Sequence, residues 1–121
     1  MTHRAARLAE TLKEEMAEII QSELKDPRLG FATVTRVEVS NDLRYAKVLV
    51  SVYGSSEDGE ATLSVLERAM GFIRSLLGRR LRLRYVPEIS FKLDPSIGYG
   101  ARVTHLLDEL KKEGAAQDEQ S

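Results

Sequence analysis

The chain has 121 residues, of which 42% are hydrophobic and 31% are charged, and its formal net charge is −1. This length and balance fit one globular domain, and the absence of cysteine excludes disulfides, thiolate nucleophiles and cysteine-based zinc sites. No apolar run is long enough to span a membrane and the charged first residues do not resemble a signal peptide, so we expect a cytoplasmic protein.

Residues 4–25 are predicted to form a long amphipathic helix. Its apolar side chains recur at helical spacing: Ala5, Leu8, Leu12, Met16, Ile19 and Leu24. The helix is expected to stop within residues 26–30, because Pro27 disfavours helical backbone in the residue before it and Gly30 lets the chain turn.

Two strands are predicted next, because apolar side chains alternate in residues 31–39 and again in residues 44–53. In the first strand one face is predicted to carry Phe31, Thr33, Thr35, Val37 and Val39. In the second strand the equivalent face carries Ala46, Val48, Val50 and Val52. Residues 40–42 are turn-forming, so we expect an antiparallel hairpin.

The second half of the chain is predicted to begin with a polar loop at residues 54–59 and a helix at residues 61–83. Gly71 and Gly78 interrupt that helix, and each is expected to break or kink it. A third strand follows at residues 89–93. Asp94 and Pro95 then resemble the start of a last helix, and residues 114–121 are expected to be a disordered tail.

The fold class expected from this order is α+β. The elements run α-β-β-α-(kink)-α-β and end with a C-terminal helix. Each element has one apolar face to bury, so a three-stranded sheet with the helices on one face is the economical packing.

Charge is strongly segregated along the chain. Six arginines and no acidic residue lie in residues 68–84, whereas residues 54–67 hold four acidic residues and no basic one. On a helix, Arg74, Arg79 and Arg82 share one side, and their guanidinium groups suit docking onto RNA phosphates. The alternative is a solvated helix face with ion pairs to acids such as Glu60 and Glu67; RNA binding is the favoured interpretation.

Other candidate RNA contacts are less distinctive. Arg4 and Arg7 either extend the basic surface or are ordinary exposed helix charges. Lys47 either contacts RNA or lies on the solvent face of the sheet, and we favour the second reading. The aromatic side chains weighed for base stacking, with core packing favoured for all of them, are Tyr45, Tyr53 and Phe72.

Catalytic and cofactor motifs are missing from the sequence. His3 and His105 are the only histidines and lack metal-ligand spacing, and there is neither a Walker A loop nor a Gly-x-Gly-x-x-Gly motif. We therefore expect no enzyme activity, no metal, no cofactor and no small-molecule substrate.

Several segments together resemble the ribosome-binding factor A family. They are Asp26-Pro27-Arg28-Leu29-Gly30-Phe31, Val39-Ser40-Asn41-Asp42-Leu43, Ala46-Lys47-Val48, Gly71-Phe72-Ile73-Arg74, Arg84-Tyr85-Val86-Pro87-Glu88 and Tyr99-Gly100-Ala101-Arg102. The resemblance implies a type II KH-like fold. It also implies binding to the small (30S) ribosomal subunit and its 16S RNA during maturation, with support for processing of the RNA 5′ end and for growth in the cold.

In this family an Ala-x-Gly kink between two helices replaces the usual KH loop, and here it matches Ala69-Met70-Gly71. Residues 1–113 are then expected to form a single RNA-binding domain, monomeric because no helix carries a sustained heptad seam. The candidate RNA-binding residues are Arg74, Arg79, Arg80, Arg82, Arg84, Arg4, Arg7 and Lys47.

Composition and spacing alone leave three other interpretations. The first is a KH-like RNA binder that acts outside ribosome assembly. The second is a small enzyme with a Tyr, Glu or Asp site, which no residue cluster supports. The third is a helical module that pairs through its first or last helix.

Overall fold

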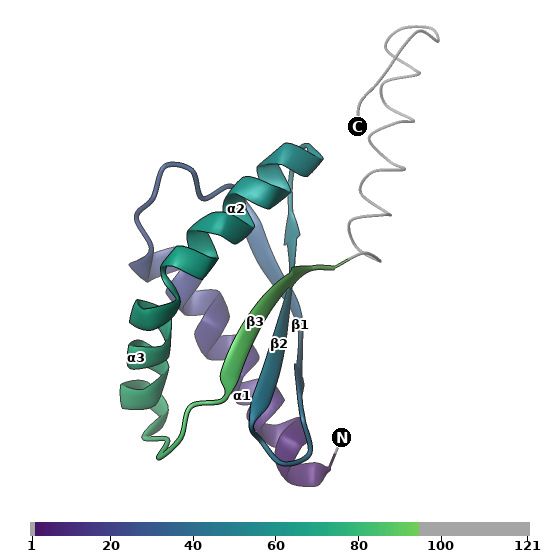
Figure 1. The fold of residues 1–121 in the computed structure, drawn as a ribbon, viewed down its shortest axis with the longest axis vertical. Helices are drawn as coiled ribbons and strands as arrows, with labels where there is room; N and C mark the ends of the chain where they lie inside the picture. Colours follow the sequence, from purple (N-terminus) through teal and green to yellow (C-terminus); the bar gives the residue numbers. More distant parts are fainter. Residues whose placement is uncertain (1, 95–121) are drawn as a thin grey trace, which may run out of the picture.

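The computed structural model describes residues 2–94, which fold into helices packed on a small sheet (Figure 1). The elements are α1 (His3–Glu18), the π-helical segment η1 (Ile19–Glu23), β1 (Ala32–Val39), β2 (Tyr45–Val52), α2 (Ser56–Arg68), α3 (Met70–Leu81) and β3 (Glu88–Leu93). The predicted order is therefore confirmed over this part of the chain. No helix within it is long and apolar enough to cross a membrane.

The sheet has the strand order β1-β2-β3. β1 and β2 form the predicted antiparallel hairpin, with Val39 opposite Ala46, whereas β2 and β3 run parallel, with Ala46 opposite Ile89. A parallel pair needs a crossover connection, and α2 with α3 supplies it (Figure 1).

One face of the sheet carries the helices and the core. The fully buried side chains include Leu12 and Met16 of α1, Leu66 of α2 and Val48 of β2. The opposite face is largely open, and its exposed side chains include Lys47, Ser90 and Lys92. The predicted layer arrangement, one sheet with helices on one face, is therefore confirmed.

The predicted facing of the first strand is wrong in its first half. Ala32 and Val34 point into the core, while Phe31 is 75% exposed and Thr33 is exposed as well. The cause is a β-bulge, because Val34 pairs with Val50 and Arg36 with Leu49, so Thr35 is the extra residue. An extra residue reverses the side-chain alternation on either side of it.

The polar loop predicted at residues 54–59 is also wrong, because α2 already begins at Ser56. Ser55 caps the helix: its hydroxyl accepts a hydrogen bond from the Asp58 N–H at 3.2 Å, and the Asp58 carboxylate accepts one from the Ser55 N–H at 2.9 Å. This reciprocal pair is a capping box, which holds a helix start in place without apolar periodicity.

The helix break falls at Ala69, where the predicted kink motif begins, and not at Gly71, where the spacing placed it, because Gly71 already lies inside α3. Ala69 leaves helical geometry, with φ −85° and ψ 5°, and separates α2 from α3. The second break predicted at Gly78 is wrong, since α3 runs through it to Leu81. A glycine weakens a helix by only about 1 kcal/mol, and the neighbouring Leu77 is fully buried and holds this turn against the core.

The predicted last helix and tail, together with the Tyr99-to-Arg102 part of the family pattern, lie outside the described residues. Asp94, the expected cap of that helix, is described. It is 6% exposed and accepts a hydrogen bond from the Thr35 hydroxyl at 2.5 Å, so the bulge residue of β1 reaches the end of β3.

Candidate nucleic-acid interface

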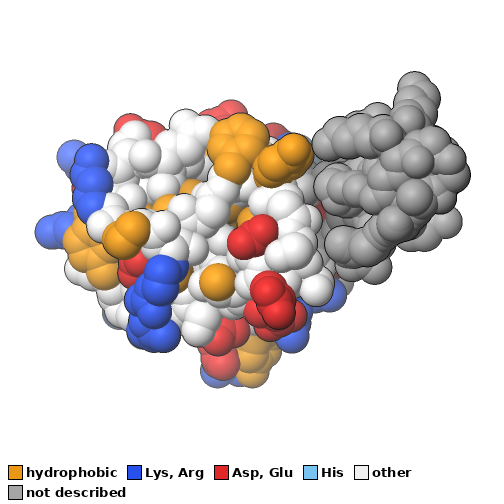
Figure 2. All heavy atoms as spheres, turned by 90° about the horizontal axis from the view of Figure 1, so that it is seen from above, with side chains coloured by type: hydrophobic (Ala, Val, Ile, Leu, Met, Phe, Trp, Pro, Cys, Tyr) orange, Lys and Arg blue, Asp and Glu red, His pale blue; other side chains and the backbone are white. Residues whose placement is uncertain are grey.

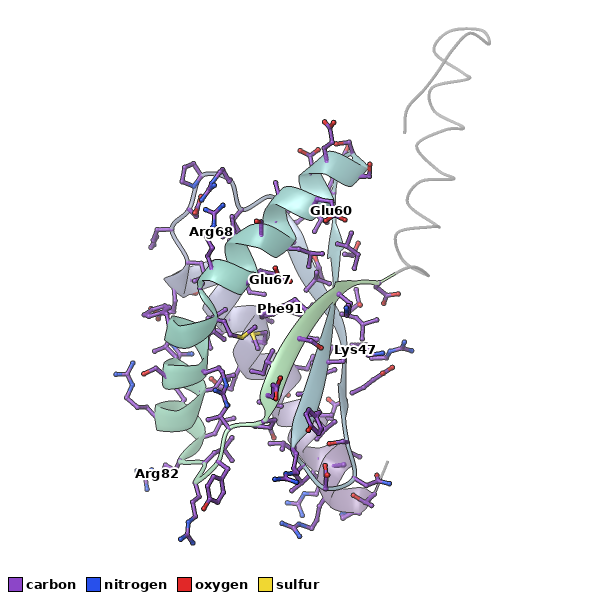
Figure 3. All side chains as sticks on the ribbon, in the orientation of Figure 1. Lys47, Glu60, Glu67, Arg68, Arg82 and Phe91 are labelled. Atoms are coloured by element: carbon purple, nitrogen blue, oxygen red, sulfur yellow. The ribbon has the colours of Figure 1, made fainter. Side chains whose placement is uncertain are left out.

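Helix α3 buries its apolar side chains and exposes arginines on its outer side, as the sequence predicts. Ile73 and Leu77 are fully buried, which fixes the rotation of the helix, while Arg74 and Arg79 are exposed on its outer side. Arg82 ends the helix in the left-handed region with φ 53° and ψ 40°. Its side chain extends away from the body at the end of α3 (Figure 3).

The loop after α3 is anchored at both of its ends. At its start the Leu83 N–H donates to the Gly78 carbonyl at 3.3 Å. At its end the Arg74 guanidinium donates to the Val86 carbonyl at 2.7 Å, and Pro87 is buried. Residues 82–86 are thus a short tethered segment beside the helix.

Two side chains of this loop lie against each other. The Arg84 guanidinium carbon is 5.8 Å from the centroid of the Tyr85 ring, within reach of a cation–π interaction. Arg84 and Tyr85 are both exposed. We call the exposed arginines of α3 and this loop the arginine face: Arg74, Arg79, Arg82 and Arg84.

Arg80 differs from its neighbour Arg79, because its guanidinium is already occupied. It donates to Glu15 at 3.3 Å and Glu23 at 3.0 Å, and also to Glu18. These carboxylates, Glu15 foremost, raise the pKa of Arg80 above its ordinary value. Arg80 therefore ties the end of α3 to α1 and η1, and we leave it out of the arginine face because three carboxylates offset its charge. Arg74 stays in, because its partner, the Val86 carbonyl, is uncharged.

The acidic partners considered from the sequence are not the ones that the fold provides. Within residues 2–94, the ion pairs of the arginine-rich segment go to Glu15, Glu18 and Glu23, and none goes to α2. Figure 3 shows why, since Glu60 lies near the start of α2 and Arg82 at the far end of α3. Glu67 and Arg68 lie where the two segments meet, and only the start of the acidic segment and the end of the basic one lie at opposite ends of the molecule (Figure 3).

Lys47 is not part of the arginine face, and Arg4 and Arg7 come from another helix. Lys47 lies on the open face of the sheet, on a different side from Arg82 (Figure 3), and its ammonium is 3.7 Å from Glu38. This agrees with the favoured solvent-face interpretation. Arg4 and Arg7 are exposed in the first half of α1. The start of this helix is held to the β1–β2 turn, because the N–H of its capping residue Thr2 donates to the Asn41 side chain at 2.9 Å.

The core packing favoured for three aromatic side chains is wrong. Tyr45, Tyr53 and Phe72 are 56%, 78% and 47% exposed, respectively. Figure 2, seen from the end at which α2 begins, shows exposed hydrophobic and acidic side chains there. Sequence reasoning also missed Tyr85, which is 79% exposed. The signal that could have found it is its position next to Arg84, in a loop that ends at Pro87.

The kink motif leaves open space at its glycine. Gly71 has no positive φ, and a Cβ placed on it meets no atom within 4 Å. Neither the backbone nor the packing of the described residues thus requires glycine at this position. The remaining physical use of a bare backbone is close approach by another molecule.

We therefore expect Gly71→Ala to raise the free energy of unfolding by up to about 1 kcal/mol, because alanine is the better helix former. Binding to the small ribosomal subunit, which the family resemblance predicts, is expected to weaken despite that gain. Chemical denaturation and cosedimentation with small subunits measure the two effects. The matched control is Gly78→Ala in the same helix, where the added Cβ meets only Val86 at 3.4 Å; equal binding by both variants would show that Gly71 is not approached.

The exposed side chains of this site are suited to binding an anionic ligand. Among the described residues no cluster of three His, Cys, Asp or Glu side chains is placed to hold a metal ion. The arginine face presents charged planar donors that match phosphate oxygens. A surface of this kind recognises a polyanion by its backbone.

Comparison with known proteins agrees with this picture. A family model described as ribosome-binding factor A matches residues 4–107. The chain is 53% identical to ribosome-binding factor A of Desulfitobacterium hafniense, over 97% of this chain and 98% of that one. The crystal structure of ribosome-binding factor A from Thermus thermophilus is 36% identical, with a TM-score of 0.66 over 74% of this chain and 93% of that one. A homology model of the Thermus thermophilus factor, fitted into a cryo-electron microscopy map of a complex of the 30S subunit with ribosome-binding factor A, is 33% identical, with a TM-score of 0.61 over 79% of this chain and 97% of that one.

Proposed function

The chain belongs to the ribosome-binding factor A family and has its KH-like fold, and from this we propose that it binds the small (30S) ribosomal subunit during assembly. The relative seen in a complex with the 30S subunit supports the choice of partner. The observation that carries the proposal is the arginine face, which leaves four guanidinium groups exposed on one helix and its loop.

The ligand of the arginine face is proposed to be 16S ribosomal RNA. Arg74, Arg79, Arg82 and Arg84 lie in a segment without acidic residues. Arg4, Arg7 and Lys47 remain further proposed contacts; of these we rank Lys47 last, because it lies on another side of the molecule from Arg82 (Figure 3).

Binding to purified small subunits should weaken steeply as salt is raised. Each phosphate that an arginine neutralises releases counterions and contributes about 0.7 to 0.9 to the slope of log affinity against log salt concentration. Cosedimentation across a salt series measures that slope. A flat response would contradict docking through the arginine face.

The finer role that the family resemblance implies is also proposed here: support for processing of the 16S RNA 5′ end, especially in the cold. The test is to compare precursor and mature 5′ ends in cells with and without the protein at low temperature. Unchanged processing would remove this part of the proposal while leaving subunit binding intact.

We propose that the protein acts by binding alone, as a cytoplasmic monomer with one RNA-binding domain over residues 1–113. What supports this is the family, which is a family of ribosome-binding factors. Turnover of RNA or nucleotide that copurifies with the protein and disappears on a point substitution would contradict this. A solution mass measurement tests the monomer.

The alternative is a KH-like RNA binder outside ribosome assembly, for which the same arginine face would serve. Capture from cells separates the two, because the present proposal requires small subunits or their precursors as the main bound RNA. The family membership favours the ribosomal ligand.

A further inference from the structure

We propose that Tyr85 is a stacking platform for one unpaired base, while Arg84 and its neighbours in the arginine face hold the phosphates of the same strand. This inference rests on the proposed RNA binding and adds a specific contact to it. With this contact, the loop at residues 82–86 is a binding site for single-stranded RNA.

The first argument is the exposure of the ring on a tethered loop. Tyr85 is 79% exposed, so its ring surface is available for stacking against a ligand. The loop that carries it is held by the Leu83 N–H to Gly78 bond and by the Arg74 bond to the Val86 carbonyl. A ring presented on a restrained backbone loses less conformational entropy when a base stacks on it.

The second argument is that basic side chains surround the ring. The Arg84 guanidinium lies 5.8 Å from the ring centroid, and Arg82 and Arg79 are exposed just before it. Residues 68–87 contain no acid, and Glu88, the first one after them, lines a hollow on the sheet with Lys47 and Tyr45. Arginines combined with an aromatic face are the chemistry that binds single-stranded nucleic acid.

A protein partner is the competing occupant, and the surroundings argue against it. An aromatic anchor in a protein interface is normally ringed by apolar side chains in the core of the patch. Tyr85 has Arg84 on one side, and Val86 on the other is partly buried against the core. The charged surroundings match a polyanion.

Tyr53 provides a matched control within the same chain. It is 78% exposed, so its ring is as available as that of Tyr85. It lies at the end of β2, just before the acidic start of α2 with Glu57 and Asp58. Acidic neighbours repel phosphates, so Tyr53 should not bind an unpaired base.

The test compares single-stranded oligouridylate with an RNA duplex of equal charge at low salt, using the full chain. Tyr85→Ala is expected to raise the Kd for the single strand by about five- to 150-fold and to leave duplex binding and the salt slope unchanged. Tyr85→Phe should keep the affinity, and Tyr85→Leu should lose it, since leucine keeps apolar area but has no ring. Tyr53→Ala should match the parent.

Each other outcome overturns the inference. Unchanged single-strand binding by Tyr85→Ala, equal losses for Tyr53→Ala, full affinity in Tyr85→Leu, or no detectable binding of the single strand by the parent would each exclude base stacking at Tyr85. The proposed function is judged separately by cosedimentation of the parent with small subunits. If the parent binds subunits while any of these outcomes holds, the stacking site alone is wrong.

Discussion

Replacing Arg74, Arg79 and Arg82 together by glutamate is expected to lower affinity for the small subunit on the order of a thousand-fold. A hydrogen bond to a charged group contributes about 1.5 kcal/mol or more, and three such contacts would be lost. The variant should fold, because all three side chains are exposed and the core contacts of α3 come from Ile73 and Leu77. It also loses the bond from Arg74 to the Val86 carbonyl, so the double variant Arg79→Glu and Arg82→Glu, which keeps that bond, should show most of the loss of binding. Circular dichroism, thermal melting and cosedimentation measure the separate effects.

The matched control carries the same change in net charge elsewhere, as Lys25→Glu, Arg36→Glu and Lys92→Glu. Lys25 follows η1, and Arg36 and Lys92 lie on the sheet; all three are exposed, and none belongs to α3 or to the loop after it. Equal losses in both variants would mean that overall charge, and not the arginine face, determines binding. A folded arginine variant that still binds would place the RNA surface elsewhere, with Arg4, Arg7 and Lys47 as the next candidates.

The second large effect concerns the support of α3. Leu77→Ala is expected to lower the free energy of unfolding by about 2–5 kcal/mol, because the leucine is fully buried and its loss leaves a cavity. A small domain has only about 5–15 kcal/mol in total. Chemical denaturation at equilibrium gives the value, and binding measured where the variant is still folded should be close to that of the parent.

Leu76→Ala is the control for this substitution. Leu76 precedes Leu77 in α3 but is only partly buried against the core, so the same truncation should cost clearly less. Equal costs would be inconsistent with the rotation of α3 described here, and the assignment of Arg74 and Arg79 to its outer side would fail with it.

The periodic parts of the fold were predictable from sequence, and the exceptions have local causes. Alternation over residues 31–39 held for Val37 and Val39, but the bulge at Thr35 reversed it for Phe31 and Thr33. The conflicting signal was already visible, since Val34 is apolar on the supposed polar face. The start of α2 was missed because a capping box depends on Ser55 and Asp58 and not on apolar spacing.

The arginine face was predictable only as a segment. Arg79 and Arg80 are adjacent and chemically identical, and yet Arg80 meets three glutamates while Arg79 is exposed. Those glutamates lie more than fifty residues earlier in the chain, so their position depends on how α3 packs on α1. Sequence spacing describes one helix at a time and cannot supply that information.

The separation of acidic and basic ends also bears on how the protein meets its ligand. Glu60 lies near the start of α2 and Arg82 near the end of α3, at opposite ends of the molecule (Figure 3). With a net charge of −1, the molecule as a whole is weakly repelled by a polyanion, but within residues 2–94 acidic side chains lie at the start of α2 and basic ones at the end of α3. If RNA is the ligand, as proposed above, its field exerts a torque on this separation of charge and turns the arginine end forward during diffusion, so that orientation and not bulk attraction governs productive encounters.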